Sequence, residues 1–333
     1  MEPKLEHNNE EQVIDVMLRP QKWDEYVGQE RVKDQLHVIL TAAKQRGEPC
    51  DHLLFYGQAG LGKTTLAHLV AQELGANCKV TSGPTLERVA DLAAVLTNLD
   101  SGDVLFIDEA HRLNRMIEEV LYPAMEARKL NIMVGKGPGA RSVALDLPPF
   151  TLVAATTRAN LLSGPLRSRF GASFKLDYYE LPDIEKILFR SADILGMSID
   201  AEATKILAAA SRFTPRSANR LLRRSRDYAQ VSNETRITAS LAQKTLDLLE
   251  IDSLGLDTYD RRLLRTIIEK FHGGPVGLGT LAAALNDDKG NIEEVYEPYL
   301  MSIGLLVRTS SGRMVADEAY THLKKELPDS RLL

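Results

Sequence analysis

Residues 57–65 of this 333-residue chain read GQAGLGKTT, and they directly follow the apolar run LLFY at residues 53–56. The stretch matches G-x-x-x-x-G-K-[ST] in full, and a helical pattern follows at residues 65–74. A glycine-rich loop between a strand and a helix points backbone N–H groups at nucleotide phosphates. The ammonium group of Lys63 then neutralises phosphate charge, and the hydroxyl of Thr64 completes a Mg²⁺ shell. A chance match in a turn is the alternative, and the flanking strand and helix argue against it. The sequence predicts a nucleoside triphosphate site.

The composition is that of an ordinary soluble protein, with 44% hydrophobic and 26% charged residues. The net charge of −5 excludes a surface that is basic throughout, so any nucleic-acid contact must be local. Cys50 and Cys78 are too few for a disulfide framework or a zinc site, and they suit a reducing cytoplasm. We find no signal peptide and no apolar run of the roughly 18 residues that a membrane span needs. We therefore expect a cytoplasmic protein without membrane contact.

The pattern of apolar residues divides the chain into three parts. Short β-rich runs at 52–56, 103–107 and 151–155 alternate with helical stretches, as in a parallel sheet with crossover helices. From residue 182 to about 249 the pattern is almost wholly helical. The last part has helical patterns at 258–271, 280–285 and 291–303, then a hairpin at 305–309 and 313–316, as in a winged helix. We expect a flexible tail at 1–17, an α/β nucleotide domain at 18–181, a helical lid at 182–254 and a winged helix at 255–333.

Two carboxylates follow the second predicted strand, in the sequence VLFIDE at residues 104–109. Asp108 is placed to hold the Mg²⁺ shell beside Thr64, and Glu109 to polarise the attacking water as a general base. Two solvated acids at a strand end are the alternative, which a complete phosphate loop disfavours. The letters DEAH at residues 108–111 also match a motif of another helicase class. That class places its nucleotide between two tandem RecA-like domains, whereas here one phosphate loop precedes a helical region.

Polar and basic residues further along complete the candidate site. Thr156-Thr157-Arg158 ends the third predicted strand, where a hydroxyl could sense the γ-phosphate. Arg169 lies in the sequence SRF, where a guanidinium at a domain edge could reach a neighbour's nucleotide, although a surface ion pair is the usual role of such an arginine. The basic stretch 212–226 has three interpretations, which are a DNA-facing stripe, a lid helix whose first arginine reaches the phosphates, and a solvated face. It contains Arg212, Arg216, Arg220, Arg223, Arg224 and Arg226.

From about Leu18 to Tyr320 the sequence resembles the RuvB family of Holliday-junction branch-migration ATPases. The resemblance rests on long strings that are more discriminating than a phosphate loop, including LRPQKWDEYVGQE (18–30), VLFIDEAHRLN (104–114), VGKGPGARSVALDLPPFTLVAATTR (134–158), LLSGPLRSRFG (161–171), TPRSANRLLRR (214–224), GGPVGLGTLA (273–282) and EPYLMSIGLLVRTSSGR (297–313). It implies an AAA+ ATPase domain with a small lid and a C-terminal winged helix. It also implies a homohexameric ring around duplex DNA that moves four-way junctions, with ATP and Mg²⁺ held between subunits.

The resemblance also assigns roles to individual residues. Thr157 would be the first sensor, Arg169 the finger given to the neighbouring subunit, and Arg216 the second sensor on the lid. The other implied nucleotide contacts are Leu18, Arg19 and Tyr26 around adenine, Tyr179 closing that pocket, and Gly57, Gly60, Gly62, Lys63, Thr64 and Thr65 around the phosphates and metal.

Partner contacts are expected at two places. The insertion at 128–146 reads as an apolar hairpin around a GKGPG turn, and the resemblance implies that it docks on a RuvA-type junction-binding protein. An exposed apolar hairpin favours burial against a partner protein, although packing on its own domain is the alternative. A RuvC-type resolvase is a further possible partner. Arg308 and Arg313 flank the wing turn and could pair with DNA phosphates. From Gly255 onward there are 10 Lys and Arg against 12 Asp and Glu, so we expect a light, salt-sensitive grip.

The sequence departs from the family at two places and leaves two rival functions open. Gln58-Ala59 stands where the family often has two prolines, and Glu126-Ala127-Arg128 is unusual near the expected subunit contacts. A clamp or helicase loader would share Lys63, Asp108 and Arg169, but the winged helix and partner hairpin count against it. A winged-helix DNA-binding protein switched by nucleotide would not need Glu109 and Arg169 intact.

Overall fold

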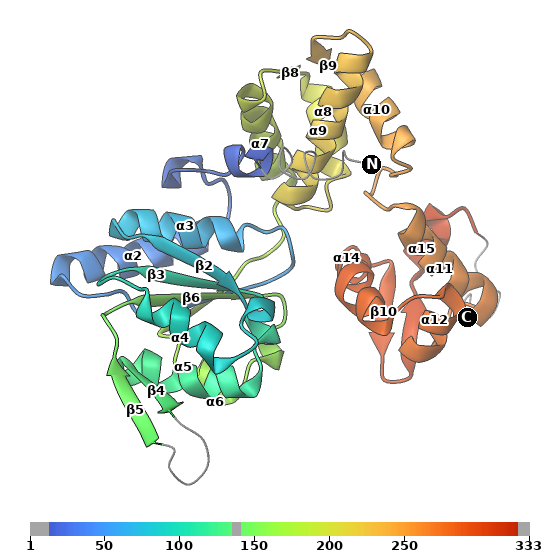
Figure 1. The fold of residues 1–333 in the computed structure, drawn as a ribbon. Coiled ribbons are helices and arrows are strands. Elements are labelled where there is room, and N and C mark those ends of the chain that lie inside the picture. The colour runs from blue at the N-terminus through green and yellow to red at the C-terminus, as the bar shows by residue number, and fades with distance from the viewer. Residues whose placement is uncertain (1–12, 135–140, 326–333) are drawn as a thin grey trace, which may run out of the picture. The chain divides into compact units, whose positions relative to one another are not determined.

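The computed structural model describes residues 13–134 and 141–325, which divide into two compact units (Figure 1). The first unit runs to Asp183 and also includes the short segment Thr214–Arg216. The second unit contains Ile184–Phe213 and the chain from Ser217 onward. The first unit carries the predicted nucleotide domain, and the second carries the predicted lid and winged helix.

A five-stranded parallel sheet forms the centre of the first unit, in the order β2-β3-β6-β1-β7. The predicted strands at 52–56, 103–107 and 151–155 are confirmed to within a residue. Parallel pairing brings the ends of β1 and β3 to either side of β6 at one edge of the sheet. The strands are β1 (Leu53–Tyr56), β2 (Cys78–Ser82), β3 (Val104–Asp108), β6 (Thr151–Thr156) and β7 (Ala172–Lys175).

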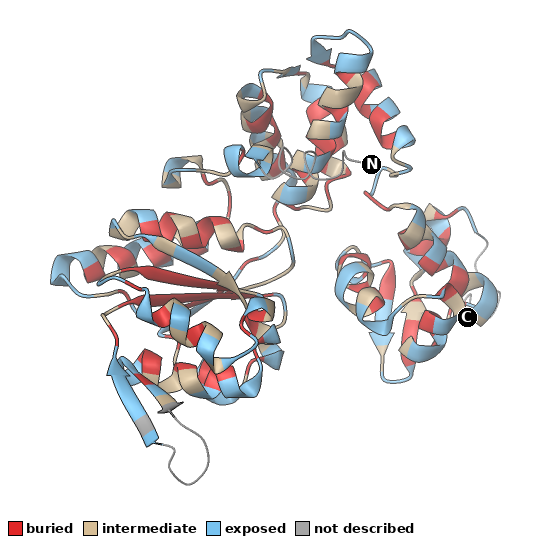
Figure 2. Ribbon diagram, in the orientation of Figure 1, coloured by how far each residue is buried: buried red, intermediate tan, exposed pale blue. Residues whose placement is uncertain are grey.

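Helices cover both faces of this sheet, so its central strands are buried on both sides (Figure 2). One face is covered by α2 (Glu30–Arg46) and α3 (Lys63–Leu74), the other by α4 (Val89–Thr97) and α5 (Arg115–Ala127). The strands β1, β3 and β6 read as nearly continuous apolar runs because alternate side chains pack against opposite helical layers. On the α4 and α5 side they contribute Leu54, Leu105, Ile107, Leu152 and Ala154 to one core.

Short helical turns and a hairpin complete the first unit. The predicted hairpin is confirmed as the antiparallel pair β4 (Lys129–Val134) and β5 (Arg141–Asp146), while its GKGPG turn lies outside the described residues. Leu130 is fully buried in the core, whereas Val143 and Leu145 are 39% and 36% exposed. The turns are η1 (Trp23–Glu25), η2 (Gly83–Thr85), η3 (Ala110–Arg112), η5 (Ala159–Leu161) and α6 (Gly164–Arg167).

The predicted lid contains four helices and one short strand pair. The helices are α7 (Leu181–Ile194), α8 (Ala201–Ala209), α9 (Pro215–Val231) and α10 (Ala239–Leu248). Thr238 caps α10 by accepting a hydrogen bond from the backbone of Leu241, as its position before the helix predicts. Apart from two short parallel strands, β8 (Ser198–Ile199) and β9 (Arg236–Ile237), this region is helical, as predicted. Such two-residue strands carry too little periodicity to be read from sequence.

The last part of the second unit has the elements of a winged helix. The helices α11 (Thr258–Phe271) and α12 (Leu278–Leu285) come first, and the hairpin β10 (Leu306–Thr309) with β11 (Gly312–Val315) forms the wing. The predicted helix at 291–303 is instead interrupted, with α13 (Lys289–Asn291), a π-helical turn η6 (Ile292–Tyr296) and α14 (Glu297–Ser302). A final helix, α15 (Asp317–His322), packs into the same core. Within the described residues, every helix is too short or too polar to span a bilayer.

Candidate functional site

The phosphate loop follows β1 directly and leads into α3, whose first residue is Lys63. Three of its glycines have positive φ, namely 144° at Gly57, 82° at Gly60 and 94° at Gly62. A Cβ atom at Gly57 would lie 2.4 Å from the carbonyl oxygen of Leu176. Backbone conformation and close packing therefore both require glycine at this point of the loop.

Lys63 is buried, and its ammonium group binds backbone carbonyls within the phosphate loop. Its Nζ donates hydrogen bonds to the carbonyl oxygens of Gly57 at 2.8 Å and Gln58 at 2.7 Å. Burial lowers the pKa of Lys63 to about 8; the charge of Asp108 opposes this shift and that of Arg216 adds to it. A cation held only by loop carbonyls fits a site that receives an anion.

The predicted metal-binding pair meets at the carboxyl edge of the sheet. The hydroxyl of Thr64 lies 3.4 Å from a carboxylate oxygen of Asp108. Hydroxyl and carboxylate oxygens are ligands that Mg²⁺ accepts together with nucleotide phosphates and water. The described part of the chain contains no cluster of three or more His, Cys, Asp or Glu side chains that could hold a metal. Thr64 and Asp108 therefore supply two of the oxygen ligands that such a metal would need.

Glu109, the predicted general base, follows Asp108 with a positive φ of 48°. Its side chain is half exposed, and one carboxylate oxygen accepts a hydrogen bond from Arg112 at 3.0 Å. The neighbouring Asp108 instead accepts the backbone N–H of Glu109 at 2.8 Å. The two carboxylates thus have separate environments, one facing Thr64 and one paired with Arg112, as their separate predicted roles require.

The end of β6 contains a contact that sequence reasoning missed. The hydroxyl of the buried Thr156 lies 3.0 Å from Nδ1 of His111 and accepts the backbone N–H of Arg158 at 2.9 Å. Thr157, the predicted sensor, comes directly after the strand and is exposed. His111 therefore ties the segment after the two carboxylates to the strand end that presents Thr157. The DEAH spelling drew attention to His111, but only the sheet order brings it to Thr156.

Two buried tyrosines lie against the phosphate loop. The hydroxyl of Tyr179 donates to that of Tyr26 at 3.2 Å, and both hydroxyls are within 3.5 Å of the carbonyl oxygen of Leu61. A Cβ atom at Gly62 would lie 2.8 Å from the Tyr26 hydroxyl. Burial raises the pKa of Tyr26 and, to about 12, that of Tyr179, so both remain protonated donors. Two predicted adenine contacts thus adjoin the loop.

The remaining predicted adenine contacts lie on the same part of the first unit. Leu18 is buried, and Arg19 is partly buried. The charge of Arg19 contributes, after burial, to lowering the pKa of His68 on α3, which places the guanidinium near that helix. Thr65, the last residue of the motif, is buried in the first turn of α3.

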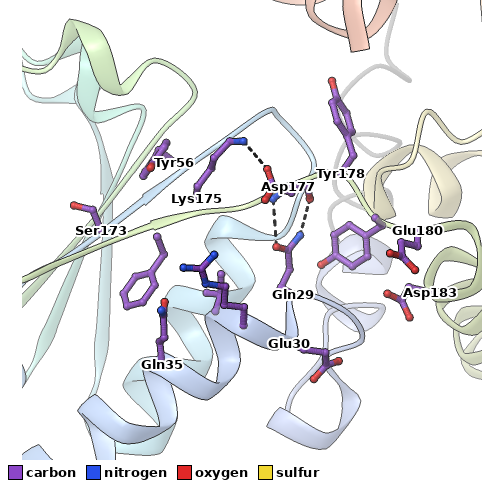
Figure 3. A pocket seen from close by; sticks show the side chains of 14 residues that line it. Gln29, Glu30, Gln35, Tyr56, Ser173, Lys175, Asp177, Tyr178, Glu180 and Asp183 are labelled. Carbon is purple, nitrogen blue, oxygen red and sulfur yellow. Dashed lines mark hydrogen bonds and ion pairs between the residues drawn. The ribbon is translucent and has the colours of Figure 1, made fainter. Parts of the chain in front are cut away.

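A polar pocket of about 640 Å³ lies beside the segment that carries Tyr179 (Figure 3). Its described lining comes from the start of α2, the ends of β1 and β7, and the chain up to Asp183. The side-chain amide of Gln29 clamps this chain, because it donates to the carbonyl of Asp177 at 2.6 Å and accepts its N–H at 3.3 Å. Lys175 pairs with the carboxylate of Asp177 at 2.7 Å. The pocket therefore flanks Tyr179, and three of its polar side chains, Gln29, Lys175 and Asp177, are engaged in these contacts.

Arg216 adjoins the phosphate loop, as the second-sensor prediction expects. The short segment Thr214–Arg216 belongs to the first unit. A Cβ atom at Gly60 would lie 3.0 Å from the Cβ of Arg216 and 3.5 Å from that of Thr214. The start of α9 is thus packed on the loop that would bind the phosphates.

Arg169, the predicted finger, is held by its own subunit. Its guanidinium donates to the carbonyl of Pro165 at 2.6 Å, lies 3.1 Å from a carboxylate oxygen of Glu126, and stacks 4.4 Å from the ring centre of Tyr122. The Arg169 side chain is 21% exposed. These contacts hold the guanidinium on α5 and α6.

Comparison with known protein families identifies all three parts of the chain. Residues 18–176 match the Holliday junction DNA helicase RuvB P-loop domain, 179–252 the RuvB AAA lid domain, and 253–324 the RuvB C-terminal winged helix domain. The chain belongs to the RuvB family. The predicted AAA+ fold with lid and winged helix is confirmed, as is the predicted role of a branch-migration ATPase. This family match disfavours the three rival interpretations, which were a loader, a nucleotide-switched DNA-binding protein and a DEAH-type helicase.

Solved structures give the same result. The structure of the Thermotoga maritima RuvB Holliday junction branch migration motor is 49% identical, with a TM-score of 0.87, over 94% of this chain and 100% of that one. A mutant form of the same Thermotoga RuvB is 50% identical, with a TM-score of 0.87, over 93% of this chain and 99% of the other.

The two predicted DNA contacts on the wing of this RuvB-family chain lie in different environments. Arg308 is about half exposed and lies 3.1 Å from Glu293. Arg313, directly opposite in the hairpin, is buried, and its Nε and Nη2 donate to the two carboxylate oxygens of Glu297 at 2.6 and 3.1 Å. In this structure the charge of Arg313 therefore faces Glu297 and not the surface, and its contact with DNA stays a prediction. Its guanidinium neutralises a buried carboxylate and fixes the wing to α14.

Proposed function

We propose that ATP binds this chain at the phosphate loop and is hydrolysed at a site that a neighbouring copy completes. The observation that carries this proposal is the arrangement of charged groups in the first unit. Lys63, Asp108 and Glu109 gather at the carboxyl edge of the sheet, whereas the guanidinium of Arg169 is held on α5 and α6 by other partners. A site that lacks its own finger favours assembly into a ring, and the family suggests a homohexamer.

Within one subunit each group has a proposed task. The loop amides and Lys63 bind the triphosphate, while Thr64 and Asp108 hold Mg²⁺, which when bound offsets phosphate charge. Glu109 accepts a proton from the attacking water, so its carboxylate must first exchange Arg112 for that water. Thr157 and Arg216 respond to the γ-phosphate. The adenine contacts are Leu18, Arg19, Tyr26 and Tyr179.

The finger acts in trans in this proposal. Arg169 leaves Glu126 and donates to the γ-phosphate bound by the next subunit, where it stabilises charge in the transition state. The Glu126 side chain is 60% exposed, so its ion pair is open to solvent and easily exchanged.

Duplex DNA is the proposed macromolecular substrate, contacted lightly through the winged helix. Arg308 on the wing is the residue we assign to phosphate contact, because its side chain is the exposed one of the pair. A single cation per subunit gives weak binding, which a ring multiplies through several simultaneous contacts. Weak individual contacts suit a motor that must release and rebind DNA.

The hairpin β4–β5 is the proposed docking site for a RuvA-type junction-binding protein. Val143 and Leu145 expose apolar surface on a two-stranded ribbon, which favours a covering partner. A RuvC-type resolvase could join the same assembly. We place this assembly in the cytoplasm, where free thiols such as those of Cys50 and Cys78 remain reduced.

The decisive experiment follows ATP-dependent movement of a synthetic four-way junction with a RuvA-type partner, beside Lys63→Ala. Resolution into duplex products only with ATP and the intact lysine supports the proposal. Robust hydrolysis without junction movement would leave an ATPase whose work is done on another substrate. The hairpin variant Val143→Asp, which places a charge on the apolar surface, separates partner docking from hydrolysis, since we expect it to lose junction movement while keeping its ATPase activity.

A further inference from the structure

Two consecutive residues, Arg212 and Phe213, form a tight elbow just before α9. Both have a φ of 54°, a left-handed conformation that non-glycine residues rarely adopt and almost never adopt in succession. Such a conformation persists only where surrounding contacts determine it, and it is enriched where proteins switch between states. The contacts that hold this elbow therefore indicate what it does.

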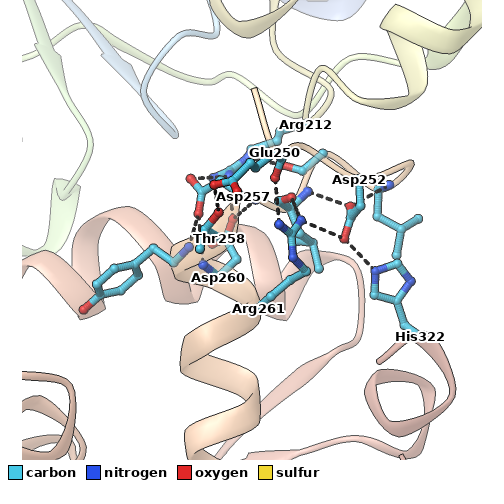
Figure 4. A network of polar contacts seen from close by, with 12 residues as sticks. Arg212, Glu250, Asp252, Asp257, Thr258, Asp260, Arg261 and His322 are labelled. Atoms are coloured by element: carbon cyan, nitrogen blue, oxygen red, sulfur yellow. Dashed lines mark hydrogen bonds and ion pairs between the residues drawn. The ribbon is translucent and has the colours of Figure 1, made fainter. Parts of the chain in front are cut away.

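Arg212 is fixed to the start of the winged helix by polar contacts (Figure 4). Its Nε donates to the carbonyl of Gly255 at 2.8 Å, and its Nη2 donates to Asp257 at 3.1 Å and to Asp260 at 2.5 Å. Asp260 is fully buried, and the Arg212 side chain is 16% exposed. Asp257 also caps α11 by accepting the backbone N–H groups of residues 259 and 260. The guanidinium thus neutralises two carboxylates that define the first turn of α11.

Phe213 adds an apolar attachment to the same domain. Its ring packs against the winged-helix core, with its centre 6.5 Å from that of Tyr299, and Arg212 lies 5.3 Å above the Tyr299 ring. The Tyr299 hydroxyl in turn donates to the carbonyl of Leu254 at 2.6 Å. The backbones also approach closely, since a Cβ atom at Gly255 would lie 2.6 Å from the carbonyl oxygen of Ala210. The elbow is therefore held by charge, packing of tilted aromatic rings and close backbone contact together.

The next residues of the chain lie on the phosphate loop. Thr214 and Arg216 belong to the first unit and approach Gly60 closely, as described above. One peptide bond, between Phe213 and Thr214, therefore separates residues anchored in the winged-helix core from residues anchored at the phosphate site. Only Thr214 lies between Phe213 and the start of α9 at Pro215, so this connection has little slack with which to absorb a displacement.

We propose that Arg212 and Phe213 form a transmission elbow, in which the pairing of Arg212 with Asp257 and Asp260 converts displacement of Arg216 at the nucleotide into displacement of the winged helix. This inference rests on the proposed role of Arg216. Arg212 is a positioning residue in this scheme, because it acts through α11 and touches neither ATP nor DNA. Its loss uncouples hydrolysis from movement of DNA and leaves the hydrolytic groups in place.

The first test compares Arg212→Lys with Arg236→Lys in the full chain. Lysine keeps the charge but lacks the planar guanidinium, whose several N–H donors reach Gly255, Asp257 and Asp260 together. Arg236 is the matched control, because it is a lid arginine paired with Asp200 and 62% exposed. For Arg212→Lys we expect ATP turnover within about twofold of the unaltered chain and at least a tenfold loss of junction movement per ATP hydrolysed. An unchanged ratio of movement to hydrolysis in Arg212→Lys would overturn the proposal.

The second test does not depend on junction movement. Amide hydrogen exchange is compared with and without ATPγS in the amides of residues 57–65 and of the first turn of α11. We expect nucleotide to protect the loop in both chains and to change exchange in α11 only in the unaltered chain. The coupling would be refuted if nucleotide left amide exchange in α11 of the unaltered chain unchanged. It would also be refuted if nucleotide changed that exchange equally in Arg212→Lys. If the unaltered chain moves no junction yet shows the α11 response, the proposed function fails while the elbow stands.

A third variant covers the case in which Arg212→Lys does not fold. Asp257→Asn keeps a side chain that caps helices well and removes one of the two carboxylates that Arg212 pairs with. It should fold, as thermal unfolding will show, and should lose part of the α11 response. Full retention of that response would count against the proposal.

Discussion

The ammonium nitrogen of Lys63 lies 2.7 Å from the carbonyl oxygen of Gln58, within the phosphate loop that it is expected to serve. A second carbonyl, that of Gly57, lies 2.8 Å away. Two neutral oxygens compensate a buried cation only in part, which is why burial dominates the pKa of Lys63. A bound triphosphate would give the Lys63 ammonium group negatively charged oxygens as partners in place of these neutral carbonyls. Nucleotide binding and protonation of Lys63 are therefore linked.

ATP binding should take up protons near pH 8. The free protein has a Lys63 pKa of about 8, and the negative phosphates raise it in the complex. Affinity should therefore fall as pH rises through 8, by up to about tenfold per pH unit above it. Calorimetry at pH 8 in buffers of different ionisation enthalpy should report about half a proton taken up per ATP bound.

Lys63→Arg provides the control for this linkage. Guanidinium does not titrate in this range, so the uptake measured at pH 8 should disappear even though binding weakens. An identical uptake in Lys63→Arg would assign the proton to another group, and the absence of uptake in the unaltered protein would contradict the lowered pKa.

Complementation between inactive variants should show that Arg169 acts on a neighbour. Arg169→Ala and Glu109→Gln should each lower ATP turnover by about 10³-fold or more. Mixed in equal amounts, they should regain activity at about a quarter of interfaces, where an intact Glu109 faces an intact Arg169 of the next subunit. Steady-state hydrolysis measures this directly.

The mixing control uses Lys63→Ala with Glu109→Gln. Both variants lack a group that serves the subunit's own nucleotide, so no interface in their mixed ring is complete. Recovery in this control, or its absence from the first mixture, would show that Arg169 does not act in trans.

Glu126 should restrain Arg169 rather than stabilise the fold. Their pair is partly exposed, and such pairs contribute about 0–1 kcal/mol to stability. Because the guanidinium must leave Glu126 to reach a neighbour, Glu126→Gln should lower the subunit concentration for half-maximal ATP turnover by about 2–5-fold. The melting temperature should stay unchanged. A fall in turnover at saturating subunit concentration would instead mean that Glu126 orients the finger for catalysis.

Local sequence signals predicted the parts of the fold that depend on neighbouring residues. The strands that end at Tyr56, Asp108 and Thr156, and the helix α11, agree with prediction because apolar patterning and capping act over a few residues. The phosphate loop and the two carboxylates could be assigned for the same reason.

Contacts between distant residues could not be predicted in this way. The pairing of Gln29 with Asp177 joins residues 148 positions apart, and that of His111 with Thr156 joins residues 45 apart. The burial of Arg313 could not be foreseen, because its partner Glu297 lies on a preceding helix, 16 residues away in the sequence. Charge near a turn predicts exposure only when no buried carboxylate demands a partner.

The wing arginines should therefore differ sharply when each is replaced. Arg313→Ala leaves Glu297 buried and unpaired, which should cost about 3–5 kcal/mol of unfolding free energy. Arg308→Ala should change stability by less than about 0.5 kcal/mol. It should instead weaken duplex binding at all sequences and lower the slope of log affinity against log salt by about one per subunit.

A double variant separates charge burial from DNA contact at Arg313. Arg313→Met combined with Glu297→Leu removes both buried charges, so stability should recover to near that of the unaltered chain. Duplex binding should recover with it, since both residues are buried in this structure. Thermal unfolding and fluorescence anisotropy over a salt series measure both quantities on one preparation. A stable double variant that fails to bind duplex would return Arg313 to the DNA contacts.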